Sequence, residues 1–204
     1  MALTSAVVIG AALIAGARGT VFSFVSAQAT RGIQVEAPVA LPWLWSAAFG
    51  DPGVGVYYDT DILTFQLRGD GVPAVAAVMT PVLAIGVLVV TLLTLLARMR
   101  KAAPAEVLAI AALGYVSAVV ALNKVGSPQY LTWYVAPVLL GLLVAPARFR
   151  LPAVLVLVAA GLTQLIYPWF YSGVTTPTPW VIAVLTLRNP VSYTHLTLPT
   201  ILRV

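Results

Sequence analysis

The sequence contains no cysteine and very few charged residues. Without cysteine among its 204 residues, the protein has neither disulfides nor thiolate metal ligands. Only 8% of the residues are charged, whereas a soluble domain carries roughly 25%. That polar fraction is too small to cover a water-exposed fold, and 61% of the residues are hydrophobic. These absences argue against an ordinary soluble domain and favour an all-α integral membrane protein.

Signs of nucleotide, metal or nucleic-acid binding are also missing. No Gly-rich phosphate loop follows a strand pattern, so we expect no soluble nucleotide site. We predict no metal site and no cofactor. The net charge of +5 does not indicate nucleic-acid binding, because the basic residues cluster at the ends of apolar runs, as topology signals do.

Apolar runs predict a polytopic helical bundle of about five to six spans, given that roughly 20 residues are needed to cross a bilayer. The runs cover residues 2–17, 73–97, 105–122, 131–145 and 151–170, and a further run begins at Trp180 and is expected to stop soon after. Between the first two runs, residues 18–72 predict an outer loop region. Within it we expect a short interfacial helix at 38–49 and an extended piece at 62–67.

Basic residues predict the orientation of this bundle. The loops at 98–101 and 148–150 are both basic, and two spans separate them, so both are expected in the cytoplasm. The loops 18–72 and 123–130 then lie on the extracytoplasmic face, together with five of the six acidic residues. We therefore predict a multi-pass protein of the inner (plasma) membrane.

Two short polar segments interrupt the apolar sequence, at residues 31–36 (RGIQVE) and 123–130 (NKVGSPQY). A lysine at a membrane boundary is costly unless it reaches water or has a partner. Our hypothesis is that both segments lie on one side of the membrane and form a single polar site. Two alternatives remain open: Lys124 extends to water without a ligand, and Arg31 and Glu36 form a local ion pair that orders a loop.

The C-terminal residues do not fit the rest of the sequence. Residues 191–200 (VSYTHLTLPT) resemble the translation of a transposase adapter used in DNA sequencing libraries. We therefore expect residues 1–189 to be a single transmembrane domain and residues 190–204 to be a non-native tail. The only histidine, His195, lies in this tail and supports no catalytic hypothesis.

Residues 1–189 resemble the C-terminal half of the membrane mannosyltransferases of glycosyltransferase family 87, in the GT-C superfamily. The two polar segments carry this resemblance, and the Ser-Pro-Gln-Tyr string at 127–130, at the start of an apolar run, is the more specific part. The resemblance implies a partial GT-C-like fold that transfers mannose from a polyprenyl-phosphate donor to a lipid-linked or glycan acceptor on the outer face. It also implies a general-base aspartate that precedes residue 1, so we expect no activity from these residues alone.

The residue chemistry suits such a donor. A cationic side chain can hold its phosphate, Arg bidentately and Lys as a point charge, and fixed cations stabilise the charge on a leaving phosphate. We assign the donor phosphate to Arg31 and Lys124. The predicted sugar- and substrate-binding residues are Gln34, Glu36, Ser127, Gln129 and Tyr130, and the aromatic ring of Trp43 or Tyr130 could cover a sugar face. The expected partners are the lipid-linked sugar, its glycolipid or glycan acceptor and membrane lipids, with no nucleic acid.

Two other functions remain as alternatives. A transporter or flippase fragment would place polar residues deep within broken spans. In this sequence the polar groups lie at the ends of the runs, which favours chemistry at the membrane surface. A non-catalytic membrane subunit would need neither polar segment. For Asp59 and Asp61, which could suggest a cation site, a solvated loop is the favoured interpretation because no further ligands follow at metal-like spacing.

Overall fold

The computed structural model describes residues 7, 10–11, 13–14, 16 and 31–197, with side chains described as far as Asn189. The chain divides into two units, residues 1–31 and residues 32–204. In the first unit, the described residues 7, 10–11 and 13–14 are helical. Most of the predicted span at 2–17 therefore lies outside the described residues. The second unit contains all the other helices and strands.

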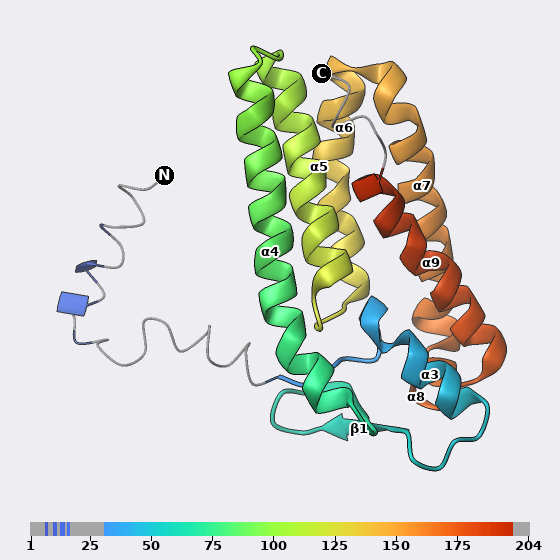
Figure 1. Ribbon diagram of the computed structural model, residues 1–204. Coiled ribbons are helices and arrows are strands. Elements are labelled where there is room, and N and C mark those ends of the chain that lie inside the picture. The colour runs from blue at the N-terminus through green and yellow to red at the C-terminus, as the bar shows by residue number, and fades with distance from the viewer. Residues whose placement is uncertain (1–6, 8–9, 12, 15, 17–30, 198–204) are drawn as a thin grey trace. The chain divides into compact units, whose positions relative to one another are not determined.

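The second unit is mostly helical (Figure 1). A short 3₁₀ turn η1 (Pro38–Ala40) leads into α3 (Leu41–Ala48), where a short interfacial helix was predicted. The long helices are α4 (Val72–Met99), α5 (Pro104–Leu122), α6 (Val135–Val144), α7 (Pro146–Gln164) and α9 (Pro179–Thr197). A 3₁₀ helix, η2 (Pro128–Tyr134), precedes α6. A π-helical segment, η3 (Leu165–Phe170), and a short helix, α8 (Ser172–Thr175), follow α7.

Proline starts most of these helices. Pro73, Pro104 and Pro146 occupy the first turn of α4, α5 and α7, where a backbone N–H would have no partner within the helix. Pro81 and Pro152 lie inside α4 and α7, a placement that membrane helices tolerate. Proline therefore sets the helix starts without breaking the spans.

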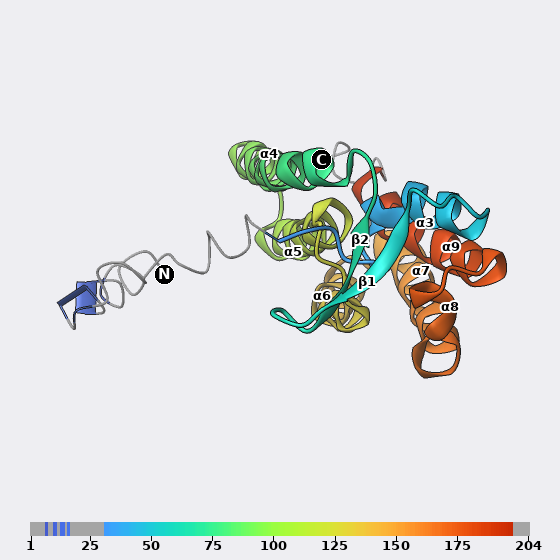
Figure 2. The ribbon, with the colours of Figure 1, turned by 90° about the horizontal axis from the view of Figure 1, so that it is seen from below.

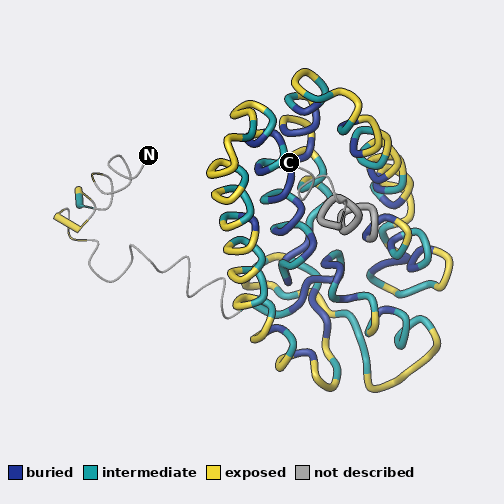
Figure 3. The backbone as a smooth tube through the Cα atoms, turned by 45° about the horizontal axis from the view of Figure 1, so that its top comes forward, coloured by how far each residue is buried: buried dark blue, intermediate teal, exposed yellow. Residues whose placement is uncertain are grey.

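Three of the described helices are long and apolar enough to cross a membrane: Val72–Met99, Pro104–Leu122 and Pro146–Phe170. The segment Pro128–Val144, where a fourth span was expected, is apolar but shorter. Exposed residues recur along α4, as the yellow stretches of the tube in Figure 3 show. They include large hydrophobic residues, among them Ile85, Leu92 and Leu95. An apolar face of this kind suits contact with lipid, and the fold is consistent with a helical membrane protein.

A two-stranded hairpin lies across one end of the helices (Figure 2). Strands β1 (Gly55–Asp59) and β2 (Thr64–Arg68) pair antiparallel, with Gly55 opposite Arg68 and Asp59 opposite Thr64. The extended piece expected at 62–67 corresponds to β2, which begins two residues later. The hairpin makes this region more regular than the predicted loop.

The opposite end of the bundle holds the turns between α4 and α5 and between α6 and α7 (Figure 1). The prediction of a loop at 148–150 is wrong, because Arg148 and Arg150 lie in the first turns of α7. The turn is tight at Ala145 because the ring of Phe149 packs directly on Gly141 of the preceding helix, where a side chain would overlap it. Arg148 forms an ion pair with Glu106 at this end.

The last helix is longer than predicted. The run that starts at Trp180 was expected to stop soon after, but α9 continues to Thr197. Residues 191–197 contain neither glycine nor proline, so nothing in them stops a helix. Residues 198–204 of the predicted artefact tail lie outside the described residues, and the adapter origin stays a prediction.

Candidate functional site

The segment that contains Ile33, Gln34 and Val35 lies between the hairpin and the loop that follows α5. On one side, Leu67 N donates to Ile33 O at 2.9 Å and Val35 N donates to Phe65 O at 3.2 Å. On the other side, Gln34 N donates to Lys124 O at 3.0 Å. Gln34 thus forms an isolated antiparallel bridge with Gln66 of β2, and the backbone of residues 33–35 joins β2 to the second polar segment.

Gln34 and Gly126 fix the contact between the two polar segments. The Gln34 side chain is only 4% exposed, and its Oε1 accepts a hydrogen bond from Gly126 N at 3.1 Å. A Cβ atom on Gly126 would overlap the backbone of Glu36 and Ala37. Glycine is therefore required for the close approach that brings the predicted site residues Gln34, Glu36 and Ser127 to one place.

Two tyrosines hold the Glu36 carboxylate. The hydroxyls of Tyr167 and Tyr171 both donate to Glu36 Oε1, at 2.8 and 2.7 Å, and their ring centroids lie 4.6 Å apart. Burial, and then the negative charge of Glu36, raise the pKa of Tyr171 above its ordinary value, so its hydroxyl stays protonated as a donor. A carboxylate with two such donors is fixed in orientation.

Arg188 and Asn189 of α9 are site residues that were not predicted from the sequence. The two residues are 8% and 2% exposed. Arg188 Nη2 donates to the backbone carbonyl of Glu36 at 3.1 Å, and Arg188 Nε and Nη2 donate to Asn189 Oδ1 at 3.1 and 3.0 Å. An arginine eight residues into the apolar run that begins at Trp180 was the available signal, because a charge inside such a run marks a functional site by default.

These residues line one small pocket between the polar segments and α9. Its free volume is about 20 Å³, which is room for a water molecule or another small group. The lining residues come from both polar segments and from four helices or turns, η1, α5, η2 and α9. They are Glu36, Pro38, Val120, Gly126, Ser127, Tyr130, Leu131, Arg188 and Asn189. Three predicted site residues, Glu36, Ser127 and Tyr130, therefore meet in this pocket, which we call the Glu36–Arg188 pocket.

The other predicted residues lie elsewhere. The Lys124 side chain is 3% exposed and its Nζ donates to the carbonyl of Ala76 in α4 at 3.2 Å; burial lowers its pKa from the ordinary value. Gln129 is exposed. Gln34 does not line the pocket, but it accepts a hydrogen bond from Gly126, which does. Arg31 is half-buried and belongs to the N-terminal unit, so the structure does not place it relative to Lys124.

The aromatic residues considered for a sugar face also differ in position. The ring of Tyr130 lines the pocket and stacks on Trp133, with centroids 4.4 Å apart. Trp43 instead donates its indole N–H to the carbonyl of Asp70 at 2.9 Å, beside the hairpin. Tyr130 is therefore the aromatic residue placed to cover a ligand in this pocket.

Asp51 and Asp59 accept hydrogen bonds from nearby residues and so stabilise turns. Asp51 Oδ2 accepts from Ser46 Oγ at 2.6 Å and Asp51 Oδ1 from Gly53 N at 2.8 Å, and these two hydrogen bonds, in that order, lower the pKa of Asp51. Asp59 Oδ1 accepts from the backbone N–H of Asp61 at 3.0 Å. In the described part of the chain, no three His, Asp or Glu side chains gather where they could hold a metal ion.

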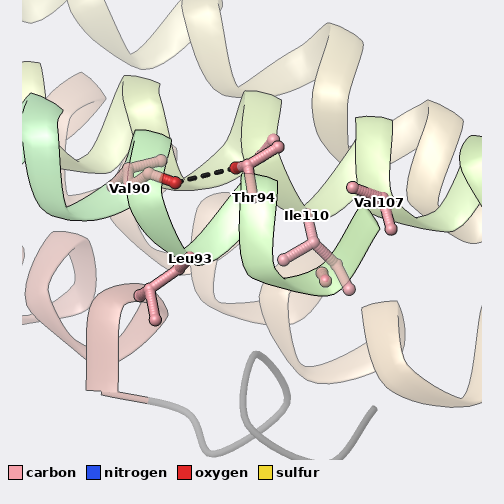
Figure 4. A pocket seen from close by; sticks show the side chains of 7 residues that line it. Val90, Leu93, Thr94, Val107 and Ile110 are labelled. Atoms are coloured by element: carbon pink, nitrogen blue, oxygen red, sulfur yellow. Dashed lines mark hydrogen bonds between the residues drawn. The ribbon is translucent and has the colours of Figure 1, made fainter. Parts of the chain in front are cut away.

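Two other pockets contain no predicted site residue. The one between α4 and α5 is apolar, as Figure 4 shows; Thr94, its only polar side chain, donates to Val90 O at 2.7 Å. The other, of about 280 Å³, lies beside α8 and includes Phe170 and Trp180. Neither joins residues of the two polar segments.

Comparison with known proteins adds no relative. No protein-family model, no curated protein and no solved structure matches this chain. Its function must therefore be inferred from the geometry of the Glu36–Arg188 pocket and from the resemblance carried by the two polar segments.

Proposed function

We propose that this protein is a membrane glycosyltransferase that transfers a sugar, mannose by resemblance, from a polyprenyl-phosphate donor to a glycolipid or glycan acceptor on the outer face of the membrane. The observation that carries the proposal is the Glu36–Arg188 pocket. Glu36, Ser127 and Tyr130 come from segments about 90 residues apart in the sequence and line one cavity beside a buried arginine. This cavity lies at an end of an apolar helical bundle, where a lipid-linked substrate would present its polar group.

The reaction would need little from the protein beyond binding and charge stabilisation. An acceptor hydroxyl attacks the anomeric carbon of the sugar, the bond from that carbon to the phosphate oxygen breaks, and the phosphate leaves with the electron pair. The hydroxyl proton goes to a general base, which the resemblance places before residue 1. Fixed cations that face the leaving phosphate stabilise its developing charge.

The polar side chains suit the remaining tasks. Glu36 and Ser127 can exchange hydrogen bonds with sugar hydroxyls at the mouth of the pocket, and the ring of Tyr130 offers an apolar face for a sugar ring. The small free volume excludes a whole sugar ring from the pocket as it stands, so the sugar would lie at the mouth or bind after a small opening. The apolar outer face of α4 is suited to the polyprenyl chain.

The test is an assay of mannose transfer from a polyprenyl-phosphate donor in membranes. The chain is assayed alone and joined to the N-terminal half of a related full-length gene, because the resemblance implies an upstream base. We expect transfer by the joined protein and none by the chain alone. No transfer by the joined protein, or movement of the donor across the membrane without product, would contradict the proposal.

Variants of the predicted phosphate residues refine this assay. If Arg31 or Lys124 contacts the donor phosphate, replacement by alanine should lower transfer by about a hundredfold, as loss of a transition-state contact does. Arg100→Ala, in the turn at the opposite end of the bundle, is the matched control and should leave transfer unchanged. Unchanged transfer in both Arg31→Ala and Lys124→Ala would show that neither residue holds the phosphate.

A further inference from the structure

Arg188 is a buried cation that forms no ion pair with any carboxylate in the described part of the chain. Its described hydrogen bonds all go to neutral oxygens, namely Asn189 Oδ1 and the backbone carbonyl of Glu36. The ion pair of Arg148 with Glu106 joins the starts of α7 and α5, which lie at the other end of the bundle (Figure 1). A buried charge is stable only when it is paired or fully hydrogen-bonded, so Arg188 lacks the partner that its burial requires.

Two buried hydrogen-bond donors in this pocket lack an acceptor. They are Arg188 Nη1 and Asn189 Nδ2, which have no hydrogen-bond partner among the residues that the structure describes. Both residues are more than nine-tenths buried and both line the Glu36–Arg188 pocket. The guanidinium can only donate, so the Asn189 oxygen must face it, which leaves the amide NH₂ to donate elsewhere. Unsatisfied donors in a pocket of this size call for an acceptor.

Glu36 does not serve as that acceptor through its carboxylate. Its Oε1 is occupied by the hydroxyls of Tyr167 and Tyr171, and it contacts Arg188 through its main-chain carbonyl. The two tyrosines thus hold the one nearby negative charge in a fixed position. The positive charge of Arg188 stays available to a ligand.

We propose that Arg188 and Asn189 bind an oxyanion with phosphate chemistry in the Glu36–Arg188 pocket. Arginine suits phosphate because its planar fork matches two oxygens, and the asparagine amide adds a neutral donor. The free volume of about 20 Å³ has room for about one water-sized atom, so one phosphate oxygen would enter the pocket while the rest of the group lies at its mouth. The identification of this group as the donor's phosphate rests on the proposed function, whereas the binding of the anion does not require transfer.

The experiment measures ligand protection of the purified full chain in an uncharged detergent. Three probes are compared by thermal unfolding: farnesyl phosphate, inorganic phosphate and uncharged farnesol. Binding to the native state alone raises Tm as the ligand concentration increases. We expect a dose-dependent rise of several degrees with farnesyl phosphate and none with farnesol. A rise with inorganic phosphate as well would indicate a site for free phosphate, and a rise with farnesyl phosphate alone would indicate a lipid headgroup; both outcomes support the anion site.

The decisive variant is Asn189→Asp. Its carboxylate keeps the acceptor that Arg188 uses, supplies the missing negative charge and replaces the free amide donor with an oxygen. We expect its Tm without ligand to equal or exceed that of the wild type, while its affinity for farnesyl phosphate falls at least about tenfold, because a like charge now occupies the site. Arg188→Gln should also lose binding, although it removes a contact that holds Glu36. Arg148→Gln is the control for a partly exposed arginine and should retain binding.

Each outcome decides the proposal. No protection of the wild type by either phosphate, equal protection by farnesol, or undiminished affinity in Asn189→Asp would overturn it. Anion binding that is lost in Asn189→Asp, in a protein that transfers no mannose when joined to an N-terminal half, would leave the anion site and remove the proposed function. Transfer by the joined protein, together with unaltered affinity in Asn189→Asp, would support the proposed function and rule out the anion site.

Discussion

Gly126→Ala is expected to destabilise the protein, because this glycine lies where the two polar segments touch. The added Cβ would overlap backbone atoms of Glu36 and Ala37, which cannot rotate away as a side-chain tip can. Overpacking of this kind costs about 1–3 kcal/mol. If the shift also breaks the hydrogen bond from Gly126 N to Gln34 Oε1, two buried polar groups lose their partner at a further cost of about 1 kcal/mol or more.

The expected total is therefore a loss of about 2–4 kcal/mol in the free energy of unfolding. For a chain of this length, each kcal/mol shifts Tm by about 2–4 °C, so Tm should fall by about 4–16 °C. Thermal unfolding in detergent, followed by circular dichroism, measures this change.

Gly161→Ala is the matched control. Gly161 lies inside α7 with nothing within 4 Å of the position that a Cβ would occupy. Alanine is favoured over glycine in a helix by about 0.5–1 kcal/mol, so this variant should be slightly more stable than the wild type. If Gly126→Ala were as stable as Gly161→Ala, the two polar segments would not be in contact and the pocket would not exist as described.

Three further changes test other contacts. Tyr171→Phe removes one of two donors to Glu36 and should lower the free energy of unfolding by about 1.5 kcal/mol, the lower end for a bond to a charged group; an unchanged Tm would show that the carboxylate is not held there. Gly141→Ala should cost about 1–3 kcal/mol because the added Cβ would overlap the buried ring of Phe149, and a stable variant would contradict this close contact. Since burial lowers the pKa of Lys124, the folded state binds this proton less tightly than the unfolded state, and stability rises with pH as the amine deprotonates. The Tm of the wild type relative to Lys124→Met should therefore be higher at pH 10 than at pH 7, and a constant difference would contradict the buried position of the amine.

Much of the fold could be predicted because it depends on local properties of the sequence. The span expected at 73–97 is α4, Val72–Met99, and the span expected at 105–122 is α5, Pro104–Leu122. Apolar run length sets where these helices can lie, and proline sets where they begin. The extent of α9 was missed because residues 190–204 were taken as a non-native tail, although residues 191–197 contain neither glycine nor proline that would stop a helix.

The site was predicted only in part. Glu36, Ser127 and Tyr130 were selected as polar residues at the ends of apolar runs, and the structure brings them into one pocket. Arg188 was not selected, because its contact with Glu36 joins residues 152 positions apart and depends on how α9 packs. For Lys124, the sequence indicates a costly charge and cannot show that the amine turns to the carbonyl of Ala76, away from the residues that line the pocket.

Thiol cross-linking in native membranes tests most directly whether the two polar segments meet at one pocket. The chain has no cysteine, so Pro38→Cys and Ser127→Cys together introduce the only two thiols, and both positions line the pocket. We predict that a short bis-maleimide joins them within one chain, whereas Ser127→Cys paired with Thr94→Cys, in the apolar pocket between α4 and α5, does not cross-link. If Pro38→Cys and Ser127→Cys each react with a monofunctional maleimide but are never joined, the segments lie apart in the membrane and both proposals lose their basis.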